Sequence, residues 1–208
     1  KVKKVLFVAT ITKHITMFHL PYLKMFKEHG YEVHVATDDD AQIPYCDVHH
    51  KISIRRNPFK IDNLKAIKQL KRIINEEKFD IVHCHTPMGS VVARLAAKKA
   101  RKNGTRVIYT AHGYHFYKGA PLINWLLYYP VEKWLARYTD TQITITQEDY
   151  DLAKKKFKIK DLHLVHGVGL DEEKFNIEVT EDEKKKLKKL LEINEDDFVI
   201  IYLSLIHI

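Results

Sequence analysis

The sequence predicts an α/β fold, a doubly wound and mostly parallel sheet with helices on both faces. Three features of the 208 residues carry this prediction. Apolar runs and amphipathic stretches alternate along the chain, which is typical of parallel strands joined by right-handed helical crossovers. The first apolar run, residues 5–9, lacks polar alternation, as expected of a strand covered on both faces. From Asp62, apolar residues recur at helical spacing with basic residues on the other faces.

The first half of the chain supplies three predicted strands and two predicted helices. The strands cover residues 5–9, 31–37 and 48–54, and the third is the weakest. The helix after the first strand ends near Gly30. Because Pro21 lies inside it, we expect regular helix only from about residue 20, with residues 10–19 as a loop or a kinked first turn. The helix from Asp62 is the clearest amphipathic one.

The second half repeats this alternation. Strands are predicted at residues 80–84, 106–111, 142–146 and 162–165. Helices are predicted at residues 88–102, from the end of the loop 112–119 to about residue 138, and for a short stretch from residue 148. Asn103 and Gly104 tolerate the left-handed conformation that ends the first of these helices.

The character of the chain changes near residue 180. Three acidic residues, 181–183, precede a lysine-rich stretch, which favours a solvated helix, with an anion-binding basic strip as the alternative. Residues 198–203 are a new apolar run, and a lone strand buries little surface. We therefore expect residues 1–178 to form one domain. Residues 179–208 are expected to be a linker helix and the first strand of a truncated second domain.

Composition excludes several classes of protein. With 45% hydrophobic residues the chain can bury a core, and an apolar stretch such as residues 122–127 is far too short to span a bilayer. No secretory signal is visible at the start. Cys46 and Cys84 lack CxxC spacing and suit a reducing compartment. We therefore expect a cytoplasmic protein, with a peripheral position at the inner face of the membrane as an option.

The net charge of +8 favours anionic partners as strongly as it indicates simple solubility. Nucleic acid is not an expected partner, because the sequence has no recognition motif and no basic strip with interleaved aromatic residues. The predicted helix before residue 138 is rich in large aromatic residues. Core packing is the first interpretation, and an anionic membrane surface is the alternative. These aromatic residues are Trp125, Tyr128, Tyr129 and Trp134.

Polar residues follow the predicted strands at their carboxyl ends, where ligands of such sheets bind. Imidazoles and hydroxyls around one cleft suit phosphates and sugar hydroxyls, and one imidazole can donate a hydrogen bond or a proton near neutral pH. For any single histidine the alternative is a structural role, such as a bond to a neighbouring carbonyl. The strand ends carry Thr10 to His14, Thr37, His85, His112, Thr146 and His166.

Other chemistries are disfavoured. His83 and His85 should face the same way, but no third ligand lies nearby in the sequence, so no metal site is predicted. Neither GxGxxG nor GxxxxGK[ST] occurs, which weakens dinucleotide and P-loop interpretations. There is also no nucleophile elbow of the hydrolase type.

Four segments carry a family resemblance. Residues 9–15 read ATITKHI, residues 80–89 read DIVHCHTPMG, residues 111–119 read AHGYHFYKG and residues 167–171 read GVGLD. In this order and spacing they resemble the GT-B retaining glycosyltransferases of family 4, in the bacterial capsular and exopolysaccharide branch. The similarity extends from residue 4 to about residue 202. It implies the Rossmann-like N-terminal half of a GT-B fold, which holds the acceptor, while a missing C-terminal half holds the nucleotide sugar.

The resemblance also implies roles for individual residues. His112 corresponds to the cleft histidine close to the transferred sugar and is the expected catalytic residue. The turn leading toward the interdomain hinge corresponds to Gly167, Gly169 and Asp171. The Gly-Gly pair that many relatives carry after the first strand is absent. The expected substrate-binding residues are Thr10, Lys13, His14, His85, Thr86, Gly113, Tyr114, His115, Lys118 and Glu148.

The implied reaction is transfer of a sugar, of hexosyltransferase type, from a nucleotide sugar to a lipid-linked saccharide. Retention at the anomeric carbon and no obligatory metal or other cofactor are expected. The leaving phosphate is thought to help take the acceptor proton in this class, so that the protein positions groups and stabilises charge. A nucleotide-sugar epimerase of the same architecture is one alternative. A module that binds acceptor or membrane, inactive alone, is the other, and the isolated chain is expected to be inactive.

Overall fold

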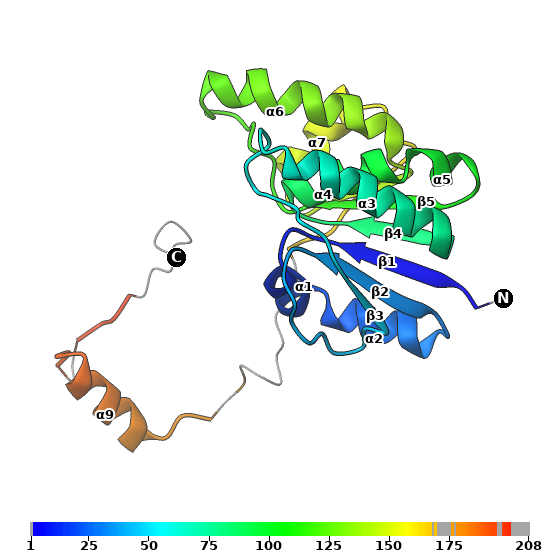
Figure 1. The fold of residues 1–208 in the computed structure, drawn as a ribbon. Helices are drawn as coiled ribbons and strands as arrows, with labels where there is room; N and C mark the ends of the chain where they lie inside the picture. Colours follow the sequence, from blue (N-terminus) through cyan, green and yellow to red (C-terminus); the bar gives the residue numbers. More distant parts are fainter. Residues whose placement is uncertain (1, 168, 170–175, 177, 195–196, 201–208) are drawn as a thin grey trace. The chain divides into compact units, whose positions relative to one another are not determined.

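A computed structural model describes residues 2–167, 169, 176, 178–194 and 197–200 of the chain (Figure 1). The chain divides into two units, residues 1–168 and 169–208. The boundary predicted between residues 178 and 179 therefore lies within the second unit, and the truncated second domain stays a prediction. Among the described residues, none of the helices combines the length and the apolar character that crossing a bilayer requires.

Seven parallel strands form one sheet in the order β3-β2-β1-β4-β5-β6-β7. The chain leaves β1 toward β2 and β3, then crosses back and continues from β4 on the other side of β1. The junction of β1 and β4 is thus the topological switch point of the sheet. The predicted doubly wound parallel sheet is confirmed. The strands are β1 (Lys4–Val8), β2 (Glu32–Thr37), β3 (Val48–Lys51), β4 (Ile81–Cys84), β5 (Arg106–Ala111), β6 (Thr141–Thr144) and β7 (Asp161–Leu164).

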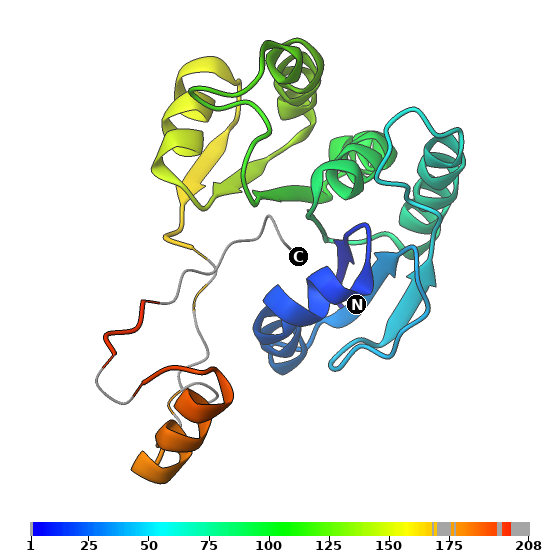
Figure 2. The same ribbon diagram turned by 90° about the vertical axis from the view of Figure 1, so that its left-hand side faces the viewer.

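Helices cover both faces of the sheet, with α1 and α2 on one face and α3 and α4 on the other (Figures 1 and 2). In the second unit the described helix is α9 (Glu181–Leu190). The helices of the first unit are α1 (Thr12–Phe18), α2 (Leu20–Glu28), α3 (Asp62–Glu77), α4 (Pro87–Ala96), α5 (Lys98–Lys102), α6 (Leu122–Leu135) and α7 (Gln147–Lys156), with a short 3₁₀ turn, η1, at Ala136–Tyr138.

Strand β1 is apolar throughout because it faces two separate core layers. Val5 and Phe7 point into the layer formed with α1 and α2. Leu6 and Val8 point into the larger layer formed with α3, α4 and α7. Since successive side chains of a strand point to opposite faces, a strand between two layers needs apolar residues at every position. This explains the continuous run that predicted a covered strand.

Three predicted elements differ from the structure. Residues 12–18 form the regular helix α1, where a loop or kinked turn was expected, and Pro21 falls in the first turn of α2, where its missing N–H costs nothing. The helix expected at residues 88–102 is divided at Ala97 into α4 and α5. The strand expected at residues 198–203 is not formed at residues 198–200, and residues 201–203 lie outside the described residues.

The helix predicted after residue 180 is confirmed and begins with a capping box. The hydroxyl of Thr180 accepts the Glu183 N–H at 3.3 Å, and the Glu183 carboxylate accepts the Thr180 N–H at 2.9 Å. These bonds satisfy two backbone donors that the first turn of a helix leaves unpaired. None of the side chains of α9 is buried, which agrees with the predicted solvated helix.

Candidate functional site

Polar residues gather at the carboxyl ends of β1, β4 and β5, beside the switch point of the sheet. His85 follows β4, and its backbone N–H donates to the carbonyl oxygen of Val8 in β1 at 2.8 Å. His112 follows β5 directly. In a doubly wound sheet this edge is where ligands bind. The sheet topology therefore brings together residues that lie far apart in the sequence.

Four histidines meet at this edge, and we call them the four-histidine cluster. One ring nitrogen from each can be chosen so that all lie within 4.8 Å of one another. Helices α1 and α2 pack over the same face of the sheet as Phe7, and β4 alternates its side chains so that His85 points to that face. The cluster consists of His14 in α1, His19 between α1 and α2, His85 after β4 and His112 after β5.

Close ring contacts hold the cluster together. The Nε2 atoms of His14 and His112 are 3.3 Å apart. The ring centroids of His19 and His85 are separated by 3.7 Å, and the His85 ring stacks on Phe7 at 5.9 Å. His83 lies beside the cluster, with its ring 4.2 Å from that of His85. The prediction that His83 and His85 face the same way is confirmed.

Burial keeps these imidazoles neutral. It lowers the pKa of His14 to about 4 and that of His19 to about 2, and neighbouring histidines add to both shifts. Burial likewise holds the pKa of His85 well below its ordinary value and lowers that of His112. A neutral ring offers one N–H and one lone pair, which suits hydrogen bonding to hydroxyl groups or binding of a metal ion.

A pair of threonines ties β1 to β4 beside the cluster. The Thr86 hydroxyl accepts the Thr10 N–H at 3.1 Å, and the two hydroxyl oxygens are 2.8 Å apart. Thr86 adopts φ 58° and ψ 149°, a backbone conformation that residues other than glycine rarely hold. A Cβ at Gly89 would lie 2.6 Å from the Thr86 hydroxyl and 3.1 Å from Ala9 Cα. Local packing and hydrogen bonds thus fix a strained residue at the candidate site.

The loop after β1 is anchored by Asp39, a residue that the sequence did not single out. Its carboxylate accepts the N–H of Thr12 at 2.9 Å and the Thr12 hydroxyl at 2.6 Å. These bonds satisfy a backbone donor at the start of α1. No signal in the local sequence relates the two residues, because they lie 27 positions apart. The other residue missed is His19, which lies in the segment where helix was not expected.

The loop after β5 carries a second group of predicted residues at the surface. The N–H of Lys118 donates to the Glu148 carboxylate at 2.7 Å, so the structure brings these two together. His115 is exposed, with its ring 4.8 Å from that of Tyr128 in α6. Gly113 has φ 117°, which allows the chain to turn at the end of β5. Lys13 lies on the exposed side of α1.

Tyr114 differs from its expected place among the substrate-binding residues. Its side chain is only 7% exposed and belongs to the core layer beneath α6 and α7, and its hydroxyl accepts a hydrogen bond from the Gln142 amide. The ring stacks against Phe116 at 4.8 Å. The alternation of buried and exposed residues along this loop explains the difference, since Tyr114 and Phe116 point inward while His115 points outward.

The predicted turn toward a hinge is described only in part. Gly167 and Gly169 have φ values of 74° and 81°, in the left-handed region that favours glycine. The Gly167 N–H donates to the carbonyl of Ile145 at 3.4 Å. Asp171 lies outside the described residues.

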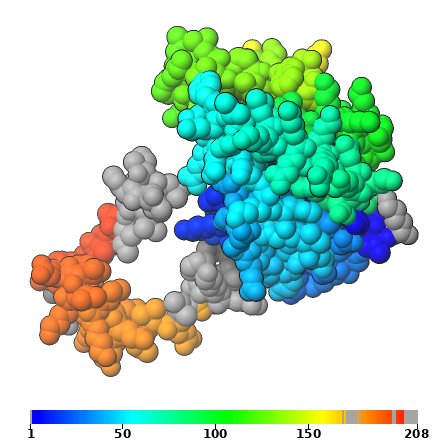
Figure 3. Space-filling view, in the orientation of Figure 1, coloured from blue at the N-terminus to red at the C-terminus, as the bar shows by residue number. Residues whose placement is uncertain are grey.

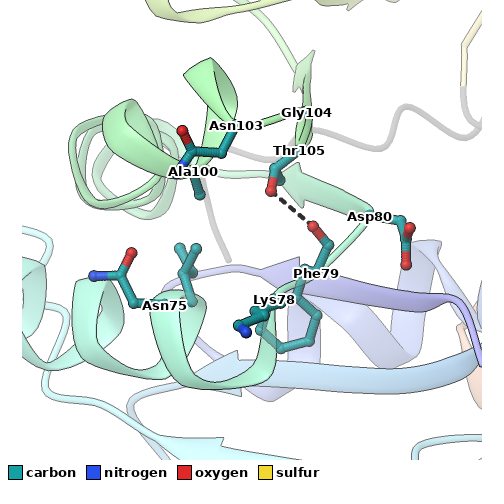
Figure 4. A pocket seen from close by; sticks show the side chains of 9 residues that line it. Asn75, Lys78, Phe79, Asp80, Ala100, Asn103, Gly104 and Thr105 are labelled. Atoms are coloured by element: carbon teal, nitrogen blue, oxygen red, sulfur yellow. Dashed lines mark hydrogen bonds between the residues drawn. The ribbon is translucent and has the colours of Figure 1, made fainter. Parts of the chain in front are cut away.

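A pocket of about 340 Å³ lies at the opposite edge of the sheet (Figure 4). It is bounded by the start of β4, where Phe79 and Asp80 lie, and by the start of β5, where the Thr105 hydroxyl donates to the Phe79 carbonyl at 2.7 Å. Ligands of parallel sheets bind at the carboxyl ends, so we assign no function to this pocket.

Comparison with known proteins identifies the family. A family model described as "Glycosyl transferase 4-like" matches residues 4–147. The chain belongs to this family. The match includes all members of the four-histidine cluster. It also includes the loop of residues 112–119, which is part of one segment that carried the resemblance at the level of sequence.

Curated relatives of this glycosyl transferase 4-like chain are longer than the chain itself. A protein of Bacillus subtilis (strain 168) named as a glycosyltransferase, EpsD, is 51% identical over 201 residues, which are 96% of this chain and 52% of the relative. The UDP-Gal:alpha-D-GlcNAc-diphosphoundecaprenol alpha-1,3-galactosyltransferase of Escherichia coli is 28% identical over 69% of this chain and 36% of its own length. The capsular polysaccharide biosynthesis glycosyltransferase CapM of Staphylococcus aureus is 25% identical over 98% and 53%. The chain thus spans about half the length of EpsD and CapM.

Solved structures share the fold of this family member. HepE of Anabaena, in complex with UDP and glucose, is 16% identical with a TM-score of 0.62, over 91% of this chain and 50% of that chain. A UDP-N-acetylglucosamine 2-epimerase is 17% identical with a TM-score of 0.55, over 78% and 47%. At such identities the likeness shows the fold alone. It agrees with the predicted N-terminal half of a GT-B fold.

Proposed function

We propose that this chain is the acceptor-side half of a retaining glycosyltransferase. The whole enzyme moves a sugar from a nucleotide sugar to a lipid-linked saccharide in the synthesis of capsule or exopolysaccharide. The family match supports a transferase, and the relatives named for capsule synthesis and for a diphosphoundecaprenol acceptor support the process and the acceptor class. The nucleotide sugar is assigned to the part of these relatives that this chain does not cover.

One observation carries the proposal for this half: His112 lies half-buried at the carboxyl end of β5, with its ring against that of His14. Burial lowers the pKa of His112, so at neutral pH the ring is uncharged. A neutral imidazole can accept a hydrogen bond from a sugar hydroxyl or donate one to it, and it has no charge that would repel neighbouring groups. In the proposed reaction His112 therefore positions the reacting sugars, and the leaving phosphate takes the acceptor proton.

The test is turnover by a full-length enzyme that carries this chain as its N-terminal half. We expect His112→Ala to lower kcat by at least about a hundredfold, since positioning and hydrogen bonding at the reacting groups are worth this much or more. His163→Ala is the matched control, because that histidine is exposed on β7. Turnover of His112→Ala close to that of the parent, with intact folding by circular dichroism, excludes the assignment.

Retention and independence from metal are further parts of the proposal, and each has its own measurement. The anomeric configuration of the product, read by proton NMR, should match that of the donor. Turnover after treatment with EDTA should be no lower than turnover before it. Inversion of configuration, or loss of activity that Mg²⁺ or Mn²⁺ restores, contradicts the corresponding part. Product formed without any acceptor would instead favour an epimerase.

The exposed face of α6 supports a peripheral contact with an anionic membrane. Trp125, Tyr128 and Tyr129 pack partly against the core, as the first interpretation predicted. The opposite face of the helix is apolar and exposed, and α6 lies at the surface of the first unit, as the green region of Figure 3 shows. Apolar residues beside basic ones suit the headgroup region of a bilayer. The exposed residues are Leu122, Ile123, Leu126, Leu127, Val131 and Trp134.

Pelleting with vesicles tests this contact. We expect the chain to bind vesicles of anionic lipid and not vesicles of neutral lipid, and Leu126→Glu to weaken binding at least about fivefold through lost burial and added repulsion. Leu64→Glu in α3 is the matched control, since Leu64 is 62% exposed and Leu126 is 63% exposed. Equal binding by both variants rules out α6 as the contact.

A further inference from the structure

The histidines of the chain differ in whether their ring nitrogens have partners. His34 contacts Glu32 at 2.7 Å and His50 at 2.8 Å, His49 contacts the Thr37 hydroxyl at 2.7 Å, and His83 contacts the Thr110 hydroxyl at 2.8 Å. Within the described part of the chain, both nitrogens of His19 and of His85 are buried without a hydrogen-bond partner. Orphaned polar atoms of this kind are rare in folded proteins, because each costs free energy.

Both orphaned rings belong to the four-histidine cluster and are almost fully buried, at 3% and 0% exposed. In a tetrahedral zinc site the metal–nitrogen bonds of about 2.0–2.1 Å put two ligand nitrogens about 3.3–3.4 Å apart. The Nε2 atoms of His14 and His112 already lie at 3.3 Å. One nitrogen of each of the four rings can be chosen so that all four lie within 4.8 Å of one another. Small movements of the rings are therefore enough to complete a tetrahedron.

We propose that the four-histidine cluster binds a divalent late transition metal ion through one imidazole nitrogen of each member. Four neutral nitrogen ligands suit Zn²⁺, Co²⁺, Ni²⁺ and Cu²⁺, whereas Mg²⁺ and Ca²⁺ require oxygen ligands. The ion gives the buried rings of His19 and His85 the partner that they lack. The half-buried rings of His14 and His112 provide the entry side of the site.

A second group of potential ligands, Glu32, His34 and Glu77, serves as an internal comparison. Here the Lys4 ammonium lies 3.1 Å from the Glu32 carboxylate and 2.7 Å from that of Glu77, and so already supplies a positive charge. Both ring nitrogens of His34 have partners as well. This group needs no ion, and we propose none for it.

The metal site is independent of the proposed sugar transfer, because metal binding requires only the four rings. If the metal site and the sugar transfer both hold, the ion binds the lone pair of the His112 ring. Metal-bound protein then has no imidazole lone pair available there. The ion is then an inhibitor and not a cofactor, in agreement with a transfer reaction that needs no metal. Failure of the metal site leaves the proposed transferase untouched, and loss of transferase activity says nothing about the metal.

The experiment uses the chain purified without a histidine tag, stripped with EDTA and titrated with Zn²⁺ or Co²⁺ alone. We expect one equivalent of Zn²⁺ to be retained after equilibrium dialysis and counted by mass spectrometry. Bound Co²⁺ should give the intense visible absorption of four-coordinate cobalt rather than the weak bands of the six-coordinate ion. Retention of no metal, or a spectrum of six-coordinate cobalt, overturns the proposal.

Variants locate the ion. His14→Ala and His112→Ala should each weaken Zn²⁺ binding at least about tenfold, since losing one of four ligands removes a metal bond. His14→Cys should restore binding and add a thiolate-to-cobalt charge-transfer band, which a purely structural role of His14 does not produce. Glu77→Gln, at the comparison group, should leave affinity unchanged. Equal affinity of the parent and both alanine variants, with folding verified by circular dichroism, refutes the site.

Discussion

The hydroxyl oxygen of Thr86 lies 2.8 Å from that of Thr10 and accepts the N–H of the same residue at 3.1 Å. These bonds join the ends of β1 and β4 at the switch point of the sheet. They also hold Thr86 at φ 58°, where a β-branched residue is strained. The candidate site therefore contains stored strain that local hydrogen bonds offset.

Two substitutions at position 86 separate the hydrogen bonds from the strain. Thr86→Val keeps the strain and leaves the Thr10 N–H without its acceptor, so we expect a loss of about 1–3 kcal/mol in the free energy of unfolding. Thr86→Gly also loses the bonds but relieves the backbone, so its loss should be smaller. Urea unfolding measures both. A glycine variant less stable than the valine variant contradicts this account.

Gly89 is required by the same local geometry. Alanine is usually better than glycine inside a helix, but a Cβ here would meet the Thr86 hydroxyl at 2.6 Å and the backbone of Ala9 at 3.1 Å. We expect Gly89→Ala to lower the free energy of unfolding by about 1–3 kcal/mol, as overpacking does. In a double-mutant cycle, adding Thr86→Gly should recover part of this loss. If the losses of the two single variants add up to the loss of the double variant, the proposed contact is contradicted.

The strand-end histidines were accessible from the sequence, because apolar runs locate the strands and topology places their carboxyl ends at one edge. His85 and His112 were found in this way. His14 was placed at the same edge, in the loop after the first strand. The joining of His19 to them was not predictable, since it depends on α1 and α2 packing over Phe7. The helix α1 itself was missed because its start is fixed by Asp39, a tertiary contact that no local pattern encodes.

Burial explains the remaining difference within the loop after β5. A motif match treats the residues of HGYHFYKG alike, but the loop alternates between core and surface, so Tyr114 packs inside while His115 and Lys118 face outward. Burial also distinguishes the two faces of α6. The aromatic content of this helix alone did not decide between core packing and membrane contact. Sequence identifies the residue types here, and tertiary packing decides which of them reach the surface.

The two cysteines are expected to be inert in the folded chain. Burial raises the pKa of Cys46 to about 11 and that of Cys84 to about 12. A thiol with so high a pKa stays protonated at pH values near 8, so almost no reactive thiolate is present there. We expect slow reaction with Ellman's reagent in native protein, accelerating as the pH approaches 11. Guanidinium should make both thiols react rapidly, and rapid labelling of native protein near pH 8 contradicts the prediction.

A buried ion pair joins α4 to α6. The Arg94 guanidinium, fully buried, donates to both carboxylate oxygens of Glu132 at 2.9–3.1 Å and lies 4.2 Å from the centre of the Tyr109 ring. Two donors of one guanidinium directed at one carboxylate fix the spacing of the two helices. Removing either partner leaves the other charge buried without compensation, which is far more costly than losing the pair.

We expect Glu132→Ala to lower the free energy of unfolding by about 3–5 kcal/mol, because it strands the Arg94 charge in the core. Arg72→Ala is the matched control, since its pair with Glu76 in α3 is exposed, and it should cost no more than about 1 kcal/mol. Arg94→Met combined with Glu132→Leu should be more stable than Glu132→Ala alone, because no charge remains buried. Chemical denaturation of the four proteins tests this order. A double variant less stable than Glu132→Ala would mean that the pair itself, rather than the stranded charge, dominates the loss.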